Sequence, residues 1–105
     1  MVEELFRKVR ELGVQPAYSA VFHPRDAKVL FVRAREGPAF SFIGTIKPGD
    51  AGKLKALLED AARRDPKLGV ELMHKDTQVK LTFSGMSPEQ QKLAVRLWHE
   101  RPKPV

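Results

Sequence analysis

The sequence predicts an α+β fold: a single domain in which an antiparallel sheet of about five strands packs against three helices, in the order α-β-β-β-α-β-β-α. Some segments carry an apolar residue every three or four positions, as amphipathic helices do, and others alternate apolar and polar residues, as half-buried strands do. A chain of 105 residues can bury one core. Residues 1–105 are therefore expected to form one domain, with Pro102–Val105 as a frayed tail.

The first helix is predicted over residues 2–12, where Leu5, Phe6 and Val9 fall on one side and charged residues on the other. Gly13 follows at the position where a glycine commonly ends a helix.

Three strands are predicted next, over residues 17–23, 28–35 and 39–46, with turn sequences between them. Because these turns are short, we expect the strands to pair in sequence order as an antiparallel meander. Strict alternation along the second strand places its side chains on two faces: Val29, Phe31, Arg33 and Arg35 on one, and Leu30, Val32 and Ala34 on the other.

The second half of the chain predicts helix, hairpin and helix. Asp50 is a suitable N-cap for a helix that ends before Pro66, and residues 70–74 and 78–84 alternate around a turn. Ser87-Pro88-Glu89-Gln90 resembles a capping box with proline at the first helical position. The helical spacing predicts a common set of buried residues: Leu5, Phe6, Val9, Leu54, Leu57, Leu58, Leu93, Leu97 and Trp98.

Residues 2–64 follow the helix–three strands–helix order of double-stranded-RNA-binding domains. The segment Leu12-Gly13-Val14-Gln15-Pro16-Ala17-Tyr18 resembles the start of that family's first strand. The Gly-Pro-x-His turn of the family is missing, and its basic Lys-Lys-x-x-Lys segment is reduced to Lys53 and Lys55. The resemblance implies a topology, and no family membership is inferred from it.

Composition excludes several classes of site. The chain has no cysteine, which excludes disulfides, a cysteine nucleophile and thiolate metal sites. The three histidines stand singly, and no serine lies in a nucleophile-elbow motif. We therefore predict no catalytic residues, no metal site and no cofactor. The start of the chain lacks a signal-peptide pattern and no apolar run is long enough to span a bilayer, so a cytoplasmic protein without membrane contact is expected. The absence of asparagine and cysteine suits a thermophilic source.

Two functions are compatible with the net charge of +6 and the short strands. The first is nucleic-acid binding without catalysis, preferably of single strands, because guanidinium groups bind phosphates and aromatic rings stack on bases. Its candidate residues lie on the second and third predicted strands: Phe31, Arg33, Arg35, Phe40 and Phe42. The second is a homodimeric or protein-partner interaction module with no nucleic-acid role. Apart from this choice, a homodimer that forms through a strand edge or an uncovered sheet face is expected. A buried face would instead turn the phenylalanines into core residues.

Overall fold

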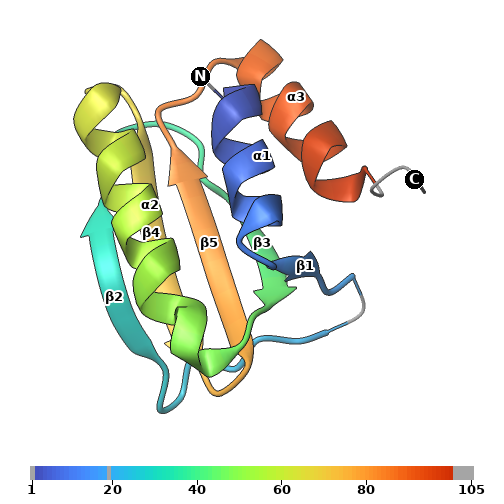
Figure 1. Cartoon of the computed structure of the whole chain (residues 1–105). Helices are drawn as coiled ribbons and strands as arrows, with labels where there is room; N and C mark the ends of the chain where they lie inside the picture. Colours follow the sequence, from blue (N-terminus) through green and yellow to red (C-terminus); the bar gives the residue numbers. More distant parts are fainter. Residues whose placement is uncertain (1, 19, 101–105) are drawn as a thin grey trace.

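The structure is a computed structural model and describes residues 2–18 and 20–100, so the predicted tail Pro102–Val105 lies outside the described residues. Three helices and a five-stranded antiparallel sheet follow in the predicted order, which confirms the fold class (Figure 1). The elements are α1 (Val2–Glu11), β1 (Gln15–Pro16), β2 (Lys28–Arg33), β3 (Phe40–Thr45), a short 3-10 turn (Pro48–Asp50), α2 (Ala51–Arg64), β4 (Gly69–Lys75), β5 (Gln78–Ser84) and α3 (Pro88–His99).

The strands lie in the order β1-β3-β5-β4-β2, so the predicted meander is wrong. β2 pairs with β4 and β3 pairs with β5, and the β4–β5 hairpin occupies the centre of the sheet. The chain leaves β2 at one edge and enters β3 on the other side of the hairpin. α2 then connects β3 to β4, which run parallel with β5 between them, as a crossover helix does.

The described residues of the predicted strand 17–23, which are 17, 18 and 20–23, also form no strand. Only Gln15–Pro16 forms a short strand against β3, and the segment after it connects the two opposite edges of the sheet. In Figure 1 this segment passes behind the lower end of the sheet. Phe22 is buried there, whereas Tyr18 and Val21 are exposed. The apolar alternation of this segment therefore reflects a single anchoring side chain and not a paired strand.

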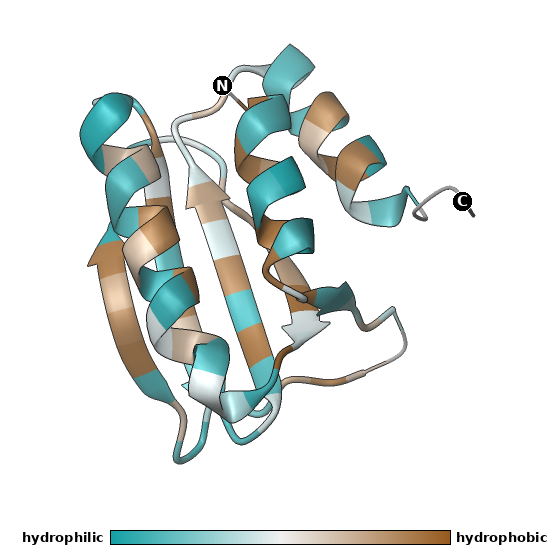
Figure 2. Ribbon diagram, in the orientation of Figure 1, coloured by the Kyte–Doolittle hydropathy of each residue, from teal (hydrophilic) through white to brown (hydrophobic). Residues whose placement is uncertain are grey.

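All three helices lie on one face of the sheet, with α2 over β4 and β2, and with α1 packed beside α3 (Figure 1). Figure 2 shows the resulting alternation of apolar and polar residues along β5. Six of the nine residues predicted to be buried are so, and three are half-buried: Leu57, Leu93 and Leu97. The predicted helical faces are thus confirmed, with the three exceptions at their margins.

The ends of the helices follow the predicted signals in two of three cases. Gly13 has a φ of 104°, and the Ser87 side chain accepts a hydrogen bond from the main chain of Gln90 in a complete capping box. Asp50 precedes α2 but makes no capping hydrogen bond, and its carboxylate instead lies 3.6 Å from Lys53. Arg10 ties α1 to the last turn of α3, because its guanidinium donates to the main-chain oxygens of Trp98 and Glu100.

The face of the sheet opposite the helices has no helix over it. Residues directly opposite each other on neighbouring strands share a face, so the register identifies its members. At the end of this face, Gly69 and Ser84 are buried where the chain passes Arg35. We call the rest of the surface the open face, and none of its side chains is fully buried: Val29, Val32, Ser41, Ile43, Thr45, Glu71, Met73, Lys75, Gln78, Lys80 and Thr82.

Candidate functional site

The two aromatic residues of β3 lie beneath the helices. Phe42 is 7% exposed and stacks on Trp98, with ring centroids 4.9 Å apart and 26° between the planes. Phe40 is half-buried and lies edge-on to Phe42, with centroids 5.5 Å apart. Both rings therefore face the core and not the open face, and Phe42 has no surface left for a stacked base.

Phe31 and Arg33 share one face of β2, as the alternation predicted, and this is again the face that the helices cover. Phe31 is half-buried against the core. Arg35 lies beyond the end of β2, in the connection to β3. The five candidate residues therefore do not form one open surface: the helices cover the face that carries four of them.

The two arginines meet at the loop between α2 and β4. Arg33 donates from Nε to the main-chain oxygen of Leu68 at 3.1 Å and from Nη2 to that of Asp65 at 2.6 Å. Arg35 donates from Nε to the main-chain oxygen of Pro66 at 2.9 Å. Because α2 ends at Arg64, these bonds satisfy carbonyl groups that follow the last turn of the helix. Both guanidinium groups are thereby held in place.

Three further cations, all exposed, lie next to this loop: Arg63 and Arg64 end α2, and Lys67 follows in the loop itself. We call the resulting group the basic corner: Arg33, Arg35, Arg63, Arg64 and Lys67. Asp60 partly offsets its charge, because its carboxylate lies 2.6 Å from Arg63 and 2.9 Å from Arg64. The hydrogen bond from Arg63 holds the pKa of Asp60 below its ordinary value.

Tight main-chain packing supports the basic corner. The main-chain N–H of Arg35 donates to the Ser84 hydroxyl at 3.0 Å, and Ser84 is buried. Gly85, with a φ of 75°, lies so close to the main-chain oxygen of Lys67 that a Cβ there would collide with it. The start of the β2–β3 connection, the α2–β4 loop and the end of β5 are therefore fixed against one another.

Each anchored guanidinium has N–H groups that form no hydrogen bond within the described residues and could donate to a ligand. The bonds of Arg33 use Nε and Nη2, and within the described residues Nη1 has no acceptor. Arg35 uses Nε and, at 3.4 Å, Nη1, while its Nη2 has no acceptor within the same residues. A guanidinium held on one edge by carbonyl groups presents its other edge to an anion with little loss of conformational freedom.

A second candidate surface is the exposed apolar part of β2, on the open face of the sheet. Val29 and Val32 are 52% and 53% exposed, although they lie in a regular strand. β2 forms one edge of the sheet and β1 the other, and Figure 1 shows no segment beyond β2. An apolar strand at the edge of a sheet offers main-chain groups and side chains to another strand.

A cavity of about 580 Å³ opens between α1, α2 and the start of α3. Leu5, Leu57 and Met86 line its apolar part. Charges of both signs line its rim, and two pairs of them are in contact, with Lys8 lying 2.9 Å from Glu4 and Arg64 lying 2.9 Å from Asp60. The remaining charged residues of the lining are also of both signs: Asp65, Lys67 and Glu89. The hydrogen bond from Lys8 keeps the pKa of Glu4 below its ordinary value. A rim balanced in this way selects neither anions nor cations.

Among the described residues no group of acidic and histidine side chains is placed to hold a metal ion. His74 Nε2 donates a hydrogen bond to the main-chain oxygen of Asp76, 2.7 Å away. His99 stacks on Tyr18, with centroids 4.9 Å apart. Over residues 2–18 and 20–100, no helix combines the length and the apolar character that crossing a bilayer requires. His74 and His99 thus have local structural partners.

Fold and site together define a small α+β protein with a one-sided antiparallel sheet, a basic corner and a free apolar edge strand. No protein-family model, curated protein or solved structure matches the chain.

Proposed function

We propose that the chain binds nucleic acid, without catalysis, by holding the phosphate backbone at the basic corner. The observation that carries this proposal is the anchoring of Arg33 and Arg35 on main-chain oxygens beside three exposed cations. Rigid guanidinium groups and nearby lysine and arginine side chains are the usual ligands of phosphate groups. The net charge of +6 supports the same proposal by attracting polyanions.

The proposal differs in one respect from the expectation based on the sequence. The preference for single strands rested on base stacking, and Phe40 and Phe42 face the core. The proposal therefore concerns phosphate contacts alone, and single-stranded and double-stranded oligonucleotides are compared in the test.

Charge reversal at the corner is expected to weaken oligonucleotide binding strongly. In Arg63→Glu/Lys67→Glu, two exposed cations become anions, so affinity should fall by about tenfold or more. The change breaks only the exposed ion pair of Arg63 with Asp60 and leaves the hydrogen bonds of Arg33 and Arg35 in place. The salt dependence should also become shallower, because fewer condensed counterions are released. Fluorescence anisotropy with a labelled 20-nucleotide strand and its duplex, at several salt concentrations, measures both effects.

Lys92→Glu provides the matched control, since Lys92 is exposed on α3 away from the corner. The proposal fails if the wild-type chain binds neither oligonucleotide. The basic corner is not the binding site if the single substitution Lys92→Glu weakens binding by half as much, in free energy, as the double substitution does.

A second candidate is an interaction module that binds a protein partner or a second copy and has no nucleic-acid role. The exposure of Val29 and Val32 on the outermost strand favours it. Exposed apolar side chains on an unpaired edge are costly unless another strand covers them. Light scattering over a wide concentration range tests for self-association.

A further inference from the structure

The edge of β2 has a definite pattern of side chains because the strand contains a β-bulge. The register against β4 shifts between Val29 and Phe31, so that Val29 lies opposite Met73 and Val32 opposite Glu71. Met73 and Glu71 are two residues apart in β4 and share a face. The bulge therefore brings both valines to the open face, although they are separated by three positions in sequence.

The other residues of β2 lie on the face that the helices cover. Lys28 pairs with His74, Phe31 with Leu72 and Arg33 with Val70. Leu30, the extra residue of the bulge, packs against the same core as Phe31. From residue 28 to residue 33, the second and fifth residues, Val29 and Val32, lie on the open face, and the other four lie on the face that the helices cover. This pattern is the same in both directions.

A pattern that reads the same in both directions suits pairing of the strand with itself. In an antiparallel pair, residues directly opposite each other must share a face. When β2 pairs with a second β2 about a twofold axis, one register satisfies this condition at every position: Lys28 opposite Arg33, Val29 opposite Val32, and Leu30 opposite Phe31. Shifting the register by one residue in either direction sets Val29 or Val32 opposite a helix-side residue. Because both copies carry the same bulge, the numbers of residues on the two strands match.

We propose that a second copy of this chain pairs with β2 in this register, which joins the two five-stranded sheets into one. The inference deepens the second proposed function, on which it rests. It satisfies the outward main-chain groups of β2 and covers the exposed valines of each copy with those of the other, in the isologous manner of twofold dimers.

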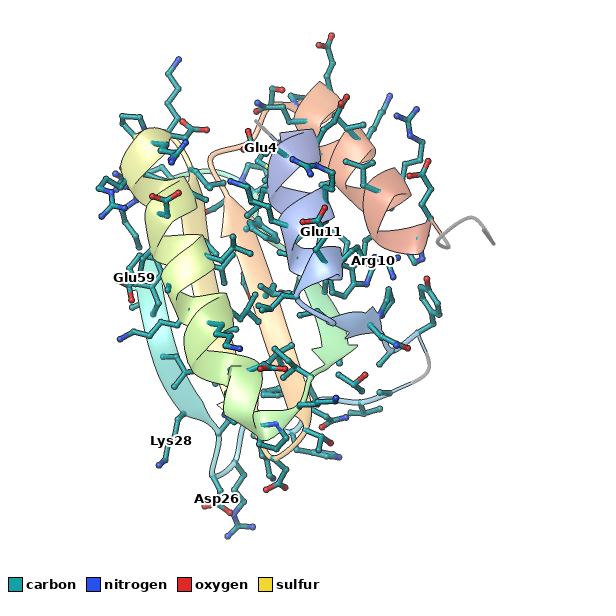
Figure 3. The ribbon with its side chains drawn as sticks, viewed as in Figure 1. Glu4, Arg10, Glu11, Asp26, Lys28 and Glu59 are labelled. Carbon is teal, nitrogen blue, oxygen red and sulfur yellow. The ribbon has the colours of Figure 1, made fainter. Side chains whose placement is uncertain are left out.

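Charge opposes this pairing only at the two ends of the paired strands. Lys28 lies at the lower end of β2, and its side chain projects away from the sheet (Figure 3). The register sets it opposite Arg33 of the second copy, a like-charged pair. Arg33 keeps its charge, but its hydrogen bonds to the main-chain oxygens of Asp65 and Leu68 direct the guanidinium toward its own loop. Like charges directly opposite one another on strands are destabilising, so these two symmetric pairs weaken the dimer and do not contribute to it.

The first test places a charge between the two paired β2 strands, a junction that we call the seam. Val32→Lys sets a lysine against Val29 of the other copy at two symmetric positions, so the dimer dissociation constant should rise about a hundredfold or more. Val95→Lys is the control, because Val95 is also exposed but lies on α3. Sedimentation velocity is expected to show dimers for the wild-type chain and for Val95→Lys, and monomers for Val32→Lys. Since Val32 is exposed in the monomer, circular dichroism should show the fold unchanged.

The second test reads the register directly. The chain has no cysteine, so introduced thiols are the only ones present. An equimolar mixture of Val29→Cys and Val32→Cys should form a disulfide-linked dimer on mild oxidation, because directly opposite Cβ atoms lie about 4.5–5.5 Å apart. Val29→Cys alone should cross-link poorly, since its two copies are offset by about 7 Å along the paired strands and lie on a diagonal that is too long for a disulfide. A mixture of Val29→Cys with Val95→Cys should also stay unlinked.

The outcomes separate this inference from the function on which it rests. A wild-type chain that stays monomeric at high concentration overturns the inference, while capture of another protein would keep the second function. A dimer that survives Val32→Lys, or that links no better in the Val29→Cys/Val32→Cys mixture than in the Val95→Cys control, overturns the β2 seam alone. Oligonucleotide binding by monomeric Val32→Lys would leave the basic corner unaffected.

Discussion

Replacement of Phe42 by alanine is expected to lower the free energy of unfolding by about 3–5 kcal/mol, because it removes a buried ring and leaves a cavity. The ring contacts Trp98 and Phe6, with centroids 4.9 and 5.7 Å away, so the loss reaches both α3 and α1. Urea denaturation measured by the fluorescence of Trp98 gives this value directly.

Ser41→Ala is the control for this substitution. Ser41 precedes Phe42 on β3 but lies on the open face, where its hydroxyl is 2.9 Å from that of Thr82. Its loss should change stability by less than about 1 kcal/mol. The opposite result for Phe42→Ala, with stability kept and oligonucleotide affinity lost, would show that the ring binds bases and is not a core residue.

The second large effect is expected at Gly85. Alanine there must adopt a φ of 75° and would bring its Cβ against the main-chain oxygen of Lys67. A left-handed conformation costs about 1–2 kcal/mol and steric overlap about 1–3 kcal/mol, so Gly85→Ala should destabilise the chain by about 2–5 kcal/mol. Chemical denaturation gives the stability, and anisotropy at low temperature shows whether the surviving folded fraction still binds oligonucleotides.

Gly49→Ala is the matched control, since a Cβ at Gly49 would meet nothing within 4 Å. It should leave stability unchanged or raise it by up to about 1 kcal/mol, because alanine restricts the unfolded chain. Equal effects of the two substitutions would mean that the α2–β4 loop and the end of β5 are not packed as described.

The helices could be predicted because their signals are local. The apolar spacing of Leu5, Phe6 and Val9 depends only on residues within two turns, and the Ser87 capping box only on residues within one. The hairpin of β4 and β5 was predicted for the same reason, since its strands are joined by a tight turn. Strand pairing is different: β2 finds its partner beyond β3 and α2, and no pattern within residues 28–46 reports that choice.

The candidate site was predicted in part. Alternation placed Phe31 and Arg33 together on one face of β2, but it contained no information on which face the helices would cover. Alternation also missed the bulge, which moved Val29 away from Phe31 and beside Val32. The basic corner depends on main-chain oxygens of Asp65, Pro66 and Leu68, and a carbonyl group has no signature in the sequence.

The strand order also has a consequence for when the protein can fold. β2 and β3 are synthesised before α2, but their partners β4 and β5 follow it, so neither strand has a partner in the first 68 residues beyond the two-residue β1. The local β4–β5 hairpin is then the natural nucleus, and the earlier strands add to it from both sides after closing long loops. A fragment ending at Leu68 should accordingly show no β-sheet signal by circular dichroism, and until the hairpin emerges the apolar β2 remains open to the wrong strands.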